Sequence, residues 1–257
     1  MVLSATPTLV SEEHLAAYER DGFFLLENVL SSDDLNILRS EVALNIAAID
    51  AEMDAKGVER LGINSKNSRY FVNALKTNPE SPVTRFIFGD LMAGITRAIL
   101  GENVYLFYEQ YVVKAAERGE SFSWHQDSGY VGHANHKPYL TCWVTLDDVN
   151  EQNGTVYMLP YEKAGTKNYV AHDYNAQNGD KTGYHGDEIG VPIIAPAGSI
   201  ACFSSTCFHR SGANQTDKMR RIYLPQYSSE PILVEDGSRL FNLATPFWEN
   251  GTRVRFE

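Results

Sequence analysis

The 257-residue chain has few cysteines, a deficit of positive charge and no long apolar segment. Its three cysteines include no CxxC pair, which disfavours a disulfide framework and favours a reducing, cytoplasmic setting. Lysine and arginine number 22 against 33 acidic residues, and the net charge of −11 disfavours nucleic acids and anionic membranes as partners. No apolar run reaches the length of a membrane span, and the first residues lack the pattern of a signal peptide.

The first third of the chain has helical patterns. Serine caps predict helices that begin after Ser11 and after Ser31 or Ser32, and a third helix is predicted over 83–100. The polar segment 57–82 is predicted to be an irregular loop that bears substrate contacts. With 43% hydrophobic residues, a chain of this length can bury a core without disulfides.

From residue 103 onward the pattern becomes that of short strands. Val104–Lys114 alternates and is rich in valine, tyrosine and phenylalanine. Turn residues separate further strand-like runs, at 121–125, 139–147, 154–159, 191–195, 199–204 and 220–227. The polar stretch 162–190 is predicted to be a surface insertion. We therefore expect a single domain over 1–257, helical over about 1–102, with a barrel or double-sheet sandwich over about 103–257.

His125 and Asp127 stand out in the segment Phe122–Tyr130, which begins in the strand-like run 121–125. Residues two apart on a strand share a face, so this imidazole and this carboxylate can point at one spot. They are two of the three ligands of a 2-His-1-carboxylate triad, the arrangement of non-haem iron(II) oxygenases. An HxD pair alone is weak evidence, because a hydrogen-bonded pair without metal explains it equally well. A second histidine must come from a distant strand.

His209 is the histidine that fits this requirement, because it follows an apolar run whereas the others lie in a helix or in polar segments. The chain then turns and enters a strand at Arg220 and Arg221, of which alternation lets only one face the interior. An oxygenase of this kind needs 2-oxoglutarate, whose far carboxylate favours a planar, bidentate arginine partner. Ser211 can add a hydroxyl donor, although a plain turn hydroxyl is the alternative.

Together these segments resemble the phytanoyl-CoA dioxygenase (PhyH-like) family of Fe(II)/2-oxoglutarate-dependent oxygenases. The resemblance runs from about Gln110 to Tyr227, with a weaker match at Asp21-Gly-Phe-Phe-Leu. The matching pieces are His125-Gln-Asp127, Cys142-Trp143-Val-Thr-Leu-Asp-Asp148, Asn153-Gly154 and His209-Arg-Ser211-Gly-Ala-Asn. This chain has Pro160-Tyr-Glu-Lys where the family commonly shows Pro-Gly-Ser-His, and this difference leaves the substrate class open.

The resemblance implies a role for seven residues. It makes His125, Asp127 and His209 the iron ligands. It assigns the 2-oxoglutarate carboxylate to Arg220, eleven positions after His209, with help from Ser211. It places two further residues in the cosubstrate pocket, namely Trp143 and Gln110. Core packing without ligand contact is the alternative for Trp143.

The resemblance also implies a mainly β fold, a double-stranded β-helix or cupin-like jelly roll with N-terminal helices. The implied cofactors are Fe(II), 2-oxoglutarate and O2, with ascorbate helpful in vitro. The implied reaction is hydroxylation of a C–H bond of a small molecule, with release of succinate and CO2, and a role in natural-product biosynthesis would fit. Desaturation, epimerisation, ring formation and endoperoxide formation stay open, because each can use the same iron ligands. Halogenation does not fit, because Asp127 occupies the position that chloride would need.

Two functions of other classes compete with this one: a cupin-like metal-dependent isomerase, and a non-catalytic binding protein on the same fold. Arg220 and Ser211 argue against the isomerase, which needs no clamp for a carboxylate, and the intact triad argues against the binding protein. The partner we expect is a small molecule, bound by a monomer or a homodimer.

Substrate contacts are predicted from position alone. Asn67 and Tyr70 are the choices from the group Asn67, Arg69, Tyr70 and Phe71, which precedes the strand region. Three aromatic residues flank the presumed metal strands: Phe107, Phe122 and Tyr130.

Overall fold

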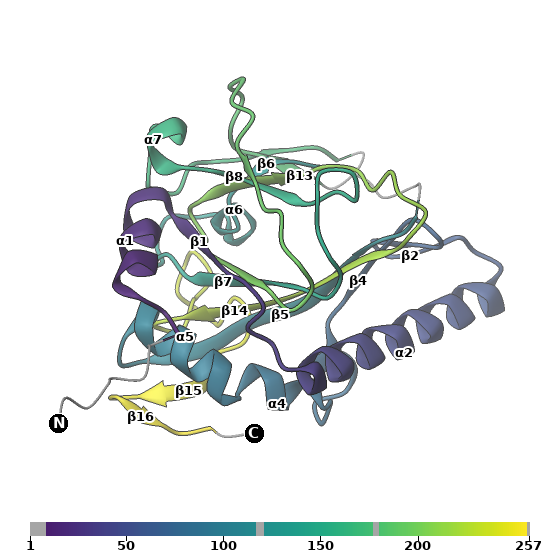
Figure 1. The fold of residues 1–257 in the computed structure, drawn as a ribbon, viewed down its shortest axis with the longest axis horizontal. Helices are drawn as coiled ribbons and strands as arrows, with labels where there is room; N and C mark the ends of the chain where they lie inside the picture. The colour runs from purple at the N-terminus through teal and green to yellow at the C-terminus, as the bar shows by residue number, and fades with distance from the viewer. Residues whose placement is uncertain (1–8, 117–120, 177–179, 256–257) are drawn as a thin grey trace.

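The computed structural model describes residues 9–116, 121–176 and 180–255. Two antiparallel sheets face each other, and helices cover the outer side of the larger sheet (Figure 1). The helices are α1 (Glu12–Asp21), α2 (Ser32–Lys56), α3 (Ala74–Thr77), α4 (Val83–Ile87), α5 (Asp90–Leu100), α6 (Ser128–Val131) and α7 (Tyr161–Ala164). The fold is thus mainly β with helices at the N-terminal end, as the sequence predicts.

The larger sheet has the order β1-β12-β7-β14-β5-β4-β3-β2, and β15 and β16 are attached beside β5. Its strands are β1 (Phe23–Leu26), β2 (Arg60–Leu61), β3 (Asn64–Ser65), β4 (Arg69–Val72), β5 (Val104–Lys114), β7 (Leu140–Thr145), β12 (Ile200–Ser204), β14 (Arg220–Ser228), β15 (Thr245–Glu249) and β16 (Thr252–Arg253). The smaller sheet has the order β11-β8-β13-β6, with β6 (Phe122–His125), β8 (Val156–Leu159), β11 (Val191–Pro192) and β13 (Phe208–Ser211). A hairpin of β9 (Asp173–Tyr174) and β10 (Lys181–Thr182) lies within the predicted insertion 162–190, of which 177–179 are outside the described residues.

The first two helices begin where their serines predict. The Ser11 side chain accepts from the backbone N–H of His14, and Gly22 ends α1 in the left-handed conformation. The Ser31 side chain caps α2 in the same way, at Asp34. The third predicted helix is wrong in one respect, because 83–100 is divided into α4 and α5 at Gly89. A Cβ at Gly89 would lie 2.5 Å from the carbonyl oxygen of Arg85, so the chain turns there in a way that favours glycine.

The prediction of a plain loop over 57–82 is also wrong. This segment forms strands β2, β3 and β4 and the short helix α3, and β4 pairs along β5 from Arg69 opposite Lys114 to Val72 opposite Tyr111. The segment is polar and each of its strands is short, so the apolar alternation that marks a strand is weak. Its partner strand supplies the hydrogen bonds that hold it.

The larger sheet separates the hydrophobic core from a cavity. On β5, Tyr111 and Val113 face the helices and belong to the main core cluster, together with Leu38 of α2 and Ile95 of α5. The alternate residues of β5 point the other way, toward the smaller sheet. The strands β4, β5, β7 and β14 therefore present one face to the main core and residues of the other face to the cavity between the sheets.

No helix within the described ranges is both long enough and apolar enough to cross a membrane.

Gly154 occupies the turn before β8 and gives a test of this architecture. Its φ is +78°, and an added Cβ would lie 2.6 Å from the backbone oxygen of Gly212. We expect Gly154→Ala to lower the free energy of unfolding by about 3 kcal/mol or more, because backbone strain and overlap add. Gly57→Ala is the matched control, since Gly57 has φ +65° but open space, and about 1 kcal/mol is expected there. Urea unfolding measures both, and equal losses would contradict the assigned overlap.

Candidate metal and cosubstrate site

Two strands of the smaller sheet bring the two histidines together. His125 ends β6, and His209 of β13 is its direct partner across the antiparallel pair. The ring centroids of the two histidines are 4.1 Å apart, and Asp127 Oδ1 lies 3.6 Å from His209 Nε2. One ligand atom from each of the three residues falls within 4.8 Å of the others, and all three side chains are buried. The pairing of distant segments thus forms the His-Asp-His cluster that the sequence predicts.

Hydrogen bonds to backbone carbonyls orient both imidazoles. The Nδ1 of His125 lies 2.8 Å from the carbonyl oxygen of Ser123. The Nδ1 of His209 lies 3.1 Å from the carbonyl oxygen of Cys207. A carbonyl only accepts, so each Nδ1 carries the proton and each Nε2 presents a lone pair to the cluster. Burial, with the neighbouring His209, lowers the pKa of His125, which favours the neutral form that a metal requires.

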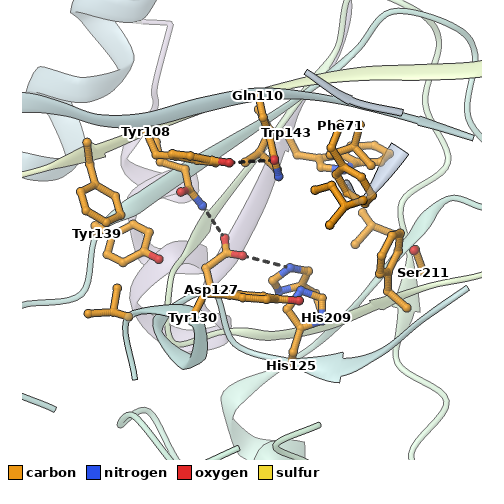
Figure 2. A pocket seen from close by; sticks show the side chains of 18 of the residues that line it. Phe71, Tyr108, Gln110, His125, Asp127, Tyr130, Tyr139, Trp143, His209 and Ser211 are labelled. Atoms are coloured by element: carbon orange, nitrogen blue, oxygen red, sulfur yellow. Dashed lines mark hydrogen bonds and ion pairs between the residues drawn. The ribbon is translucent and has the colours of Figure 1, made fainter. Parts of the chain in front are cut away.

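Two hydrogen-bond donors hold one oxygen of the Asp127 carboxylate. Thr141 donates to Asp127 Oδ2 at 2.5 Å, and the Gln226 amide donates to the same oxygen at 2.9 Å. Gln226 also donates to the Thr141 hydroxyl at 3.0 Å, so the three side chains form a closed group. The other oxygen, Oδ1, is the one on the side of His209 (Figure 2). The carboxylate is therefore prepared to bind a metal through Oδ1 alone.

This donor set suits iron(II). Two neutral imidazole nitrogens and one carboxylate oxygen, gathered on one side of a shared point, are the facial triad of non-haem iron oxygenases. Such a triad leaves coordination positions open on the opposite side. The three residues line a cavity of about 470 Å³, which is within the size range of small-molecule sites.

Arg220 lines this cavity from β14, six residues before Gln226, whose amide contacts Asp127, so it lies at the end away from the Asp127 carboxylate. It is 2% exposed, and its Nη2 donates to the carbonyl of Gly154 at 2.9 Å. Arg221 faces outward and pairs with Asp147 at 2.6 Å, as alternation along the strand requires. The guanidinium of Arg220 lies 5.7 Å from the ring centre of Trp143, which also lines the cavity.

The guanidinium of Arg220 is prepared for an anion. Its Nε is buried and finds no partner among the described residues. Burial lowers the pKa of Arg220 to about 10, which still leaves the group charged at neutral pH. A buried cation with an unused donor needs an anionic partner, so a carboxylate fits this end of the cavity.

The other predicted cosubstrate residues also line the cavity. Ser211 lies on β13, two residues after His209, and Gln110 faces the triad from β5 (Figure 2). The hydroxyl of Tyr108 donates to Gln110 Oε1 at 2.9 Å. The amide oxygen of Gln110 is therefore occupied, and its N–H groups are left for the cavity.

Of the five predicted substrate contacts, Phe107, Phe122 and Tyr130 line the cavity. Asn67 and Tyr70 are not among its lining residues, and for these two the prediction needs correction. Tyr70 is 1% exposed on the core side of β4, where its hydroxyl donates to Asp50 at 2.8 Å and accepts from the backbone N–H of Asn67 at 3.1 Å. Strand alternation sends their neighbours Arg69 and Phe71 into the cavity instead.

Sequence reasoning missed several residues that support the site. Thr141 stands two positions before Trp143, and Gln226 stands six after Arg220. Lys114, which donates to the Ser211 hydroxyl at 2.8 Å, stands four positions after Gln110. An even spacing on one strand means a shared face, so the pattern that selected Gln110, Trp143 and Arg220 also pointed to these neighbours.

Comparisons with known proteins agree with this geometry. The chain is 27% identical over 238 residues to an ectoine dioxygenase of Bordetella bronchiseptica, an alignment that covers 86% of this chain and 76% of the relative. It is 25% identical over 232 residues to an L-proline trans-4-hydroxylase of Streptomyces griseoviridis, covering 82% and 84%.

Solved structures share the fold. EctD from S. alaskensis, solved with 2-oxoglutarate and 5-hydroxyectoine, matches with a TM-score of 0.69 and 22% identity over 98% of this chain and 89% of that chain. The 2-oxoglutarate-dependent carbocyclase SnoK from nogalamycin biosynthesis matches with a TM-score of 0.63 and 19% identity, and 92% of each chain is covered. The profile of the phytanoyl-CoA dioxygenase (PhyH) family matches residues 18–222, and the chain therefore belongs to this family of iron- and 2-oxoglutarate-dependent oxygenases.

Proposed function

We propose that this enzyme hydroxylates a C–H bond of a small molecule, and that it uses one 2-oxoglutarate and one O2 for each turnover. The observation that carries the proposal is the joint presence of an intact His-Asp-His cluster and a buried arginine at the far end of the same cavity. Iron(II) bound with 2-oxoglutarate and O2 supplies the oxidising chemistry and leaves succinate and CO2. The chain's own residues bind, orient and exclude water.

In this proposal His125, Asp127 and His209 hold the metal, and the carbonyl-bound Nδ1 atoms prevent the imidazoles from turning away. Arg220 binds the far carboxylate of 2-oxoglutarate, with Ser211 as a second donor. Trp143 packs beside that guanidinium and shields it from water. Gln110, whose amide orientation is fixed by Tyr108, donates toward the metal-binding end.

The cavity wall near Asp127 is aromatic, which favours a small substrate with an apolar or ring portion. Phe107, Tyr139 and Phe241 come from three separate segments and form one aromatic cluster. The ring centroids of Phe107 and Tyr139 are 4.8 Å apart, and those of Phe107 and Phe241 are 6.1 Å apart. The Tyr130 ring lies edge-on to the His125 ring, with the centroids 5.5 Å apart, and lines the same cavity. Aromatic walls of this kind hold a C–H bond in place and keep water out.

The first test is succinate release. With Fe(II), ascorbate and 2-oxoglutarate, we expect succinate to form only in the presence of O2 and to form faster when a true substrate is added. His209→Ala removes a ligand and should abolish it, whereas His136→Ala, outside the cluster, should not. Succinate is measured by mass spectrometry. Absence of oxygen-dependent succinate across a broad substrate panel would favour an isomerase or a binding protein instead.

Arg220 and Arg221 give a matched pair for the cosubstrate. We expect Arg220→Met to raise the KM for 2-oxoglutarate on the order of 100-fold or more, because a buried charge-assisted contact is lost. Arg221→Met removes an equal charge that is paired with Asp147 outside the cavity, and should change the KM less than about twofold. Steady-state kinetics at varied 2-oxoglutarate measure both. An equal effect of the two substitutions would show that total charge matters rather than the cavity position.

The donors to Asp127 give a test that needs no turnover. We expect Thr141→Val and Gln226→Leu each to weaken metal binding by about 10- to 100-fold, because these contacts orient the ligating carboxylate. Thr96→Val is the control, since Thr96 is a buried threonine on α5. Anaerobic titration with Co(II), followed by absorbance, measures the affinities. Wild-type affinity in both variants would contradict this role.

A further inference from the structure

Lys114 is a buried cation that the proposed chemistry has not yet used. It ends β5 with 1% of its surface exposed. In the register of the larger sheet it lies opposite Arg220 on one side and opposite Arg69 on the other. Directly opposed residues on neighbouring strands share a face, so all three cations belong to the row at the Arg220 end of the cavity. Burial of an ammonium group is costly, and this cost points to a function.

The contacts of Lys114 lead to Ser211. Its Nζ donates to Ser211 Oγ at 2.8 Å and also to the backbone carbonyl of Gly212. The ammonium group stands over the Phe122 ring at 5.0 Å, and Phe122 and Ser211 both line the cavity whereas Lys114 is not among its lining residues. Lys114 therefore does not contact the cavity itself, but it donates a hydrogen bond to Ser211, which does.

The chemistry of the two groups sets the direction of this hydrogen bond. An ammonium group has three donors and no acceptor, so the Ser211 oxygen must accept. The hydroxyl proton of Ser211 is then left to donate to another group, and the side chain faces the cavity end that holds Arg220. A serine held in this way is an obligate donor toward whatever binds there.

We infer that Lys114 is a positioning residue for the cosubstrate, which fixes Ser211 as a hydrogen-bond donor and adds a second positive charge where the far carboxylate of 2-oxoglutarate binds. This inference rests on the proposed function, because it needs a dicarboxylate at the Arg220 end. It predicts that the contribution of Lys114 depends on the far carboxylate and not on the 2-oxo acid group that faces the metal.

A pair of ligands separates the two ends of the cosubstrate. 2-Oxoglutarate and 2-oxobutyrate share the 2-oxo acid group, but 2-oxobutyrate lacks the far carboxylate. Binding of each is measured by titration into the anaerobic Fe(II)-loaded protein, which requires no turnover. We expect Lys114→Met to weaken 2-oxoglutarate about tenfold or more and to change 2-oxobutyrate less than about twofold. Arg220→Met should show the same selectivity and serves as the positive control.

The serine is tested by a double-mutant cycle. If Lys114 acts through Ser211, the loss caused by Ser211→Ala should be clearly smaller in the Lys114→Met background than in the wild type. Lys114→Arg keeps the charge and a donor, and should recover part of the affinity for 2-oxoglutarate. Unchanged binding of 2-oxobutyrate by the same variants shows that they are folded and hold the metal.

Two results would overturn the inference while leaving the proposed function in place. One is an equal loss of both ligands in Lys114→Met, which indicates a general structural role. The other is no loss of 2-oxoglutarate affinity. If the wild-type protein binds neither 2-oxo acid, the proposed function itself fails, and the inference fails with it.

Discussion

The antiparallel pairing of β6 with β13 is the constraint on which the site depends. It places His209 opposite His125, although 84 positions of chain separate them, and it sets Asp127 just beyond the same strand end. A shift of one residue in this register would turn one imidazole to the other face of the sheet. The carbonyls of Ser123 and Cys207, which hold the two Nδ1 atoms, come from the same two chain segments. The pairing of these two segments therefore sets both the position and the orientation of the two imidazoles.

The site also concentrates buried charge, which stability alone would not favour. Arg220 and Lys114 are almost fully buried at facing positions of two neighbouring strands. Arg220 donates a hydrogen bond to the backbone carbonyl of Gly154, and its Nε has no hydrogen-bond partner in the part of the chain described. A buried donor without a partner, such as the Arg220 Nε, costs free energy until a ligand completes it. The same strands carry an apolar core on their other face, which offsets this cost.

The sequence predicted the β-rich fold, the His-Asp-His cluster and the inward-facing position of Arg220, because strand alternation and residue chemistry pointed the same way. It did not predict β4, because four residues, Arg-Tyr-Phe-Val, within a polar segment are too few to show a period, and Tyr70 was therefore chosen where Arg69 and Phe71 face the cavity. It also missed Thr141 and Gln226, which contact Asp127 from β7 and β14, two strands of the larger sheet. Such contacts depend on the register between strands, which a single sequence does not reveal.

The metal ligands and the aromatic wall come from different parts of the chain. β6 and β13 carry the two histidines, and Asp127 follows β6, whereas Phe107 belongs to β5 and Phe241 to the connection between β14 and β15. Substitution in that connection can reshape the wall without moving an imidazole or the Asp127 carboxylate. Under the proposed function, substitutions in this connection would change substrate preference while the His-Asp-His cluster stays in place, so the connection is where redesign of the substrate would begin.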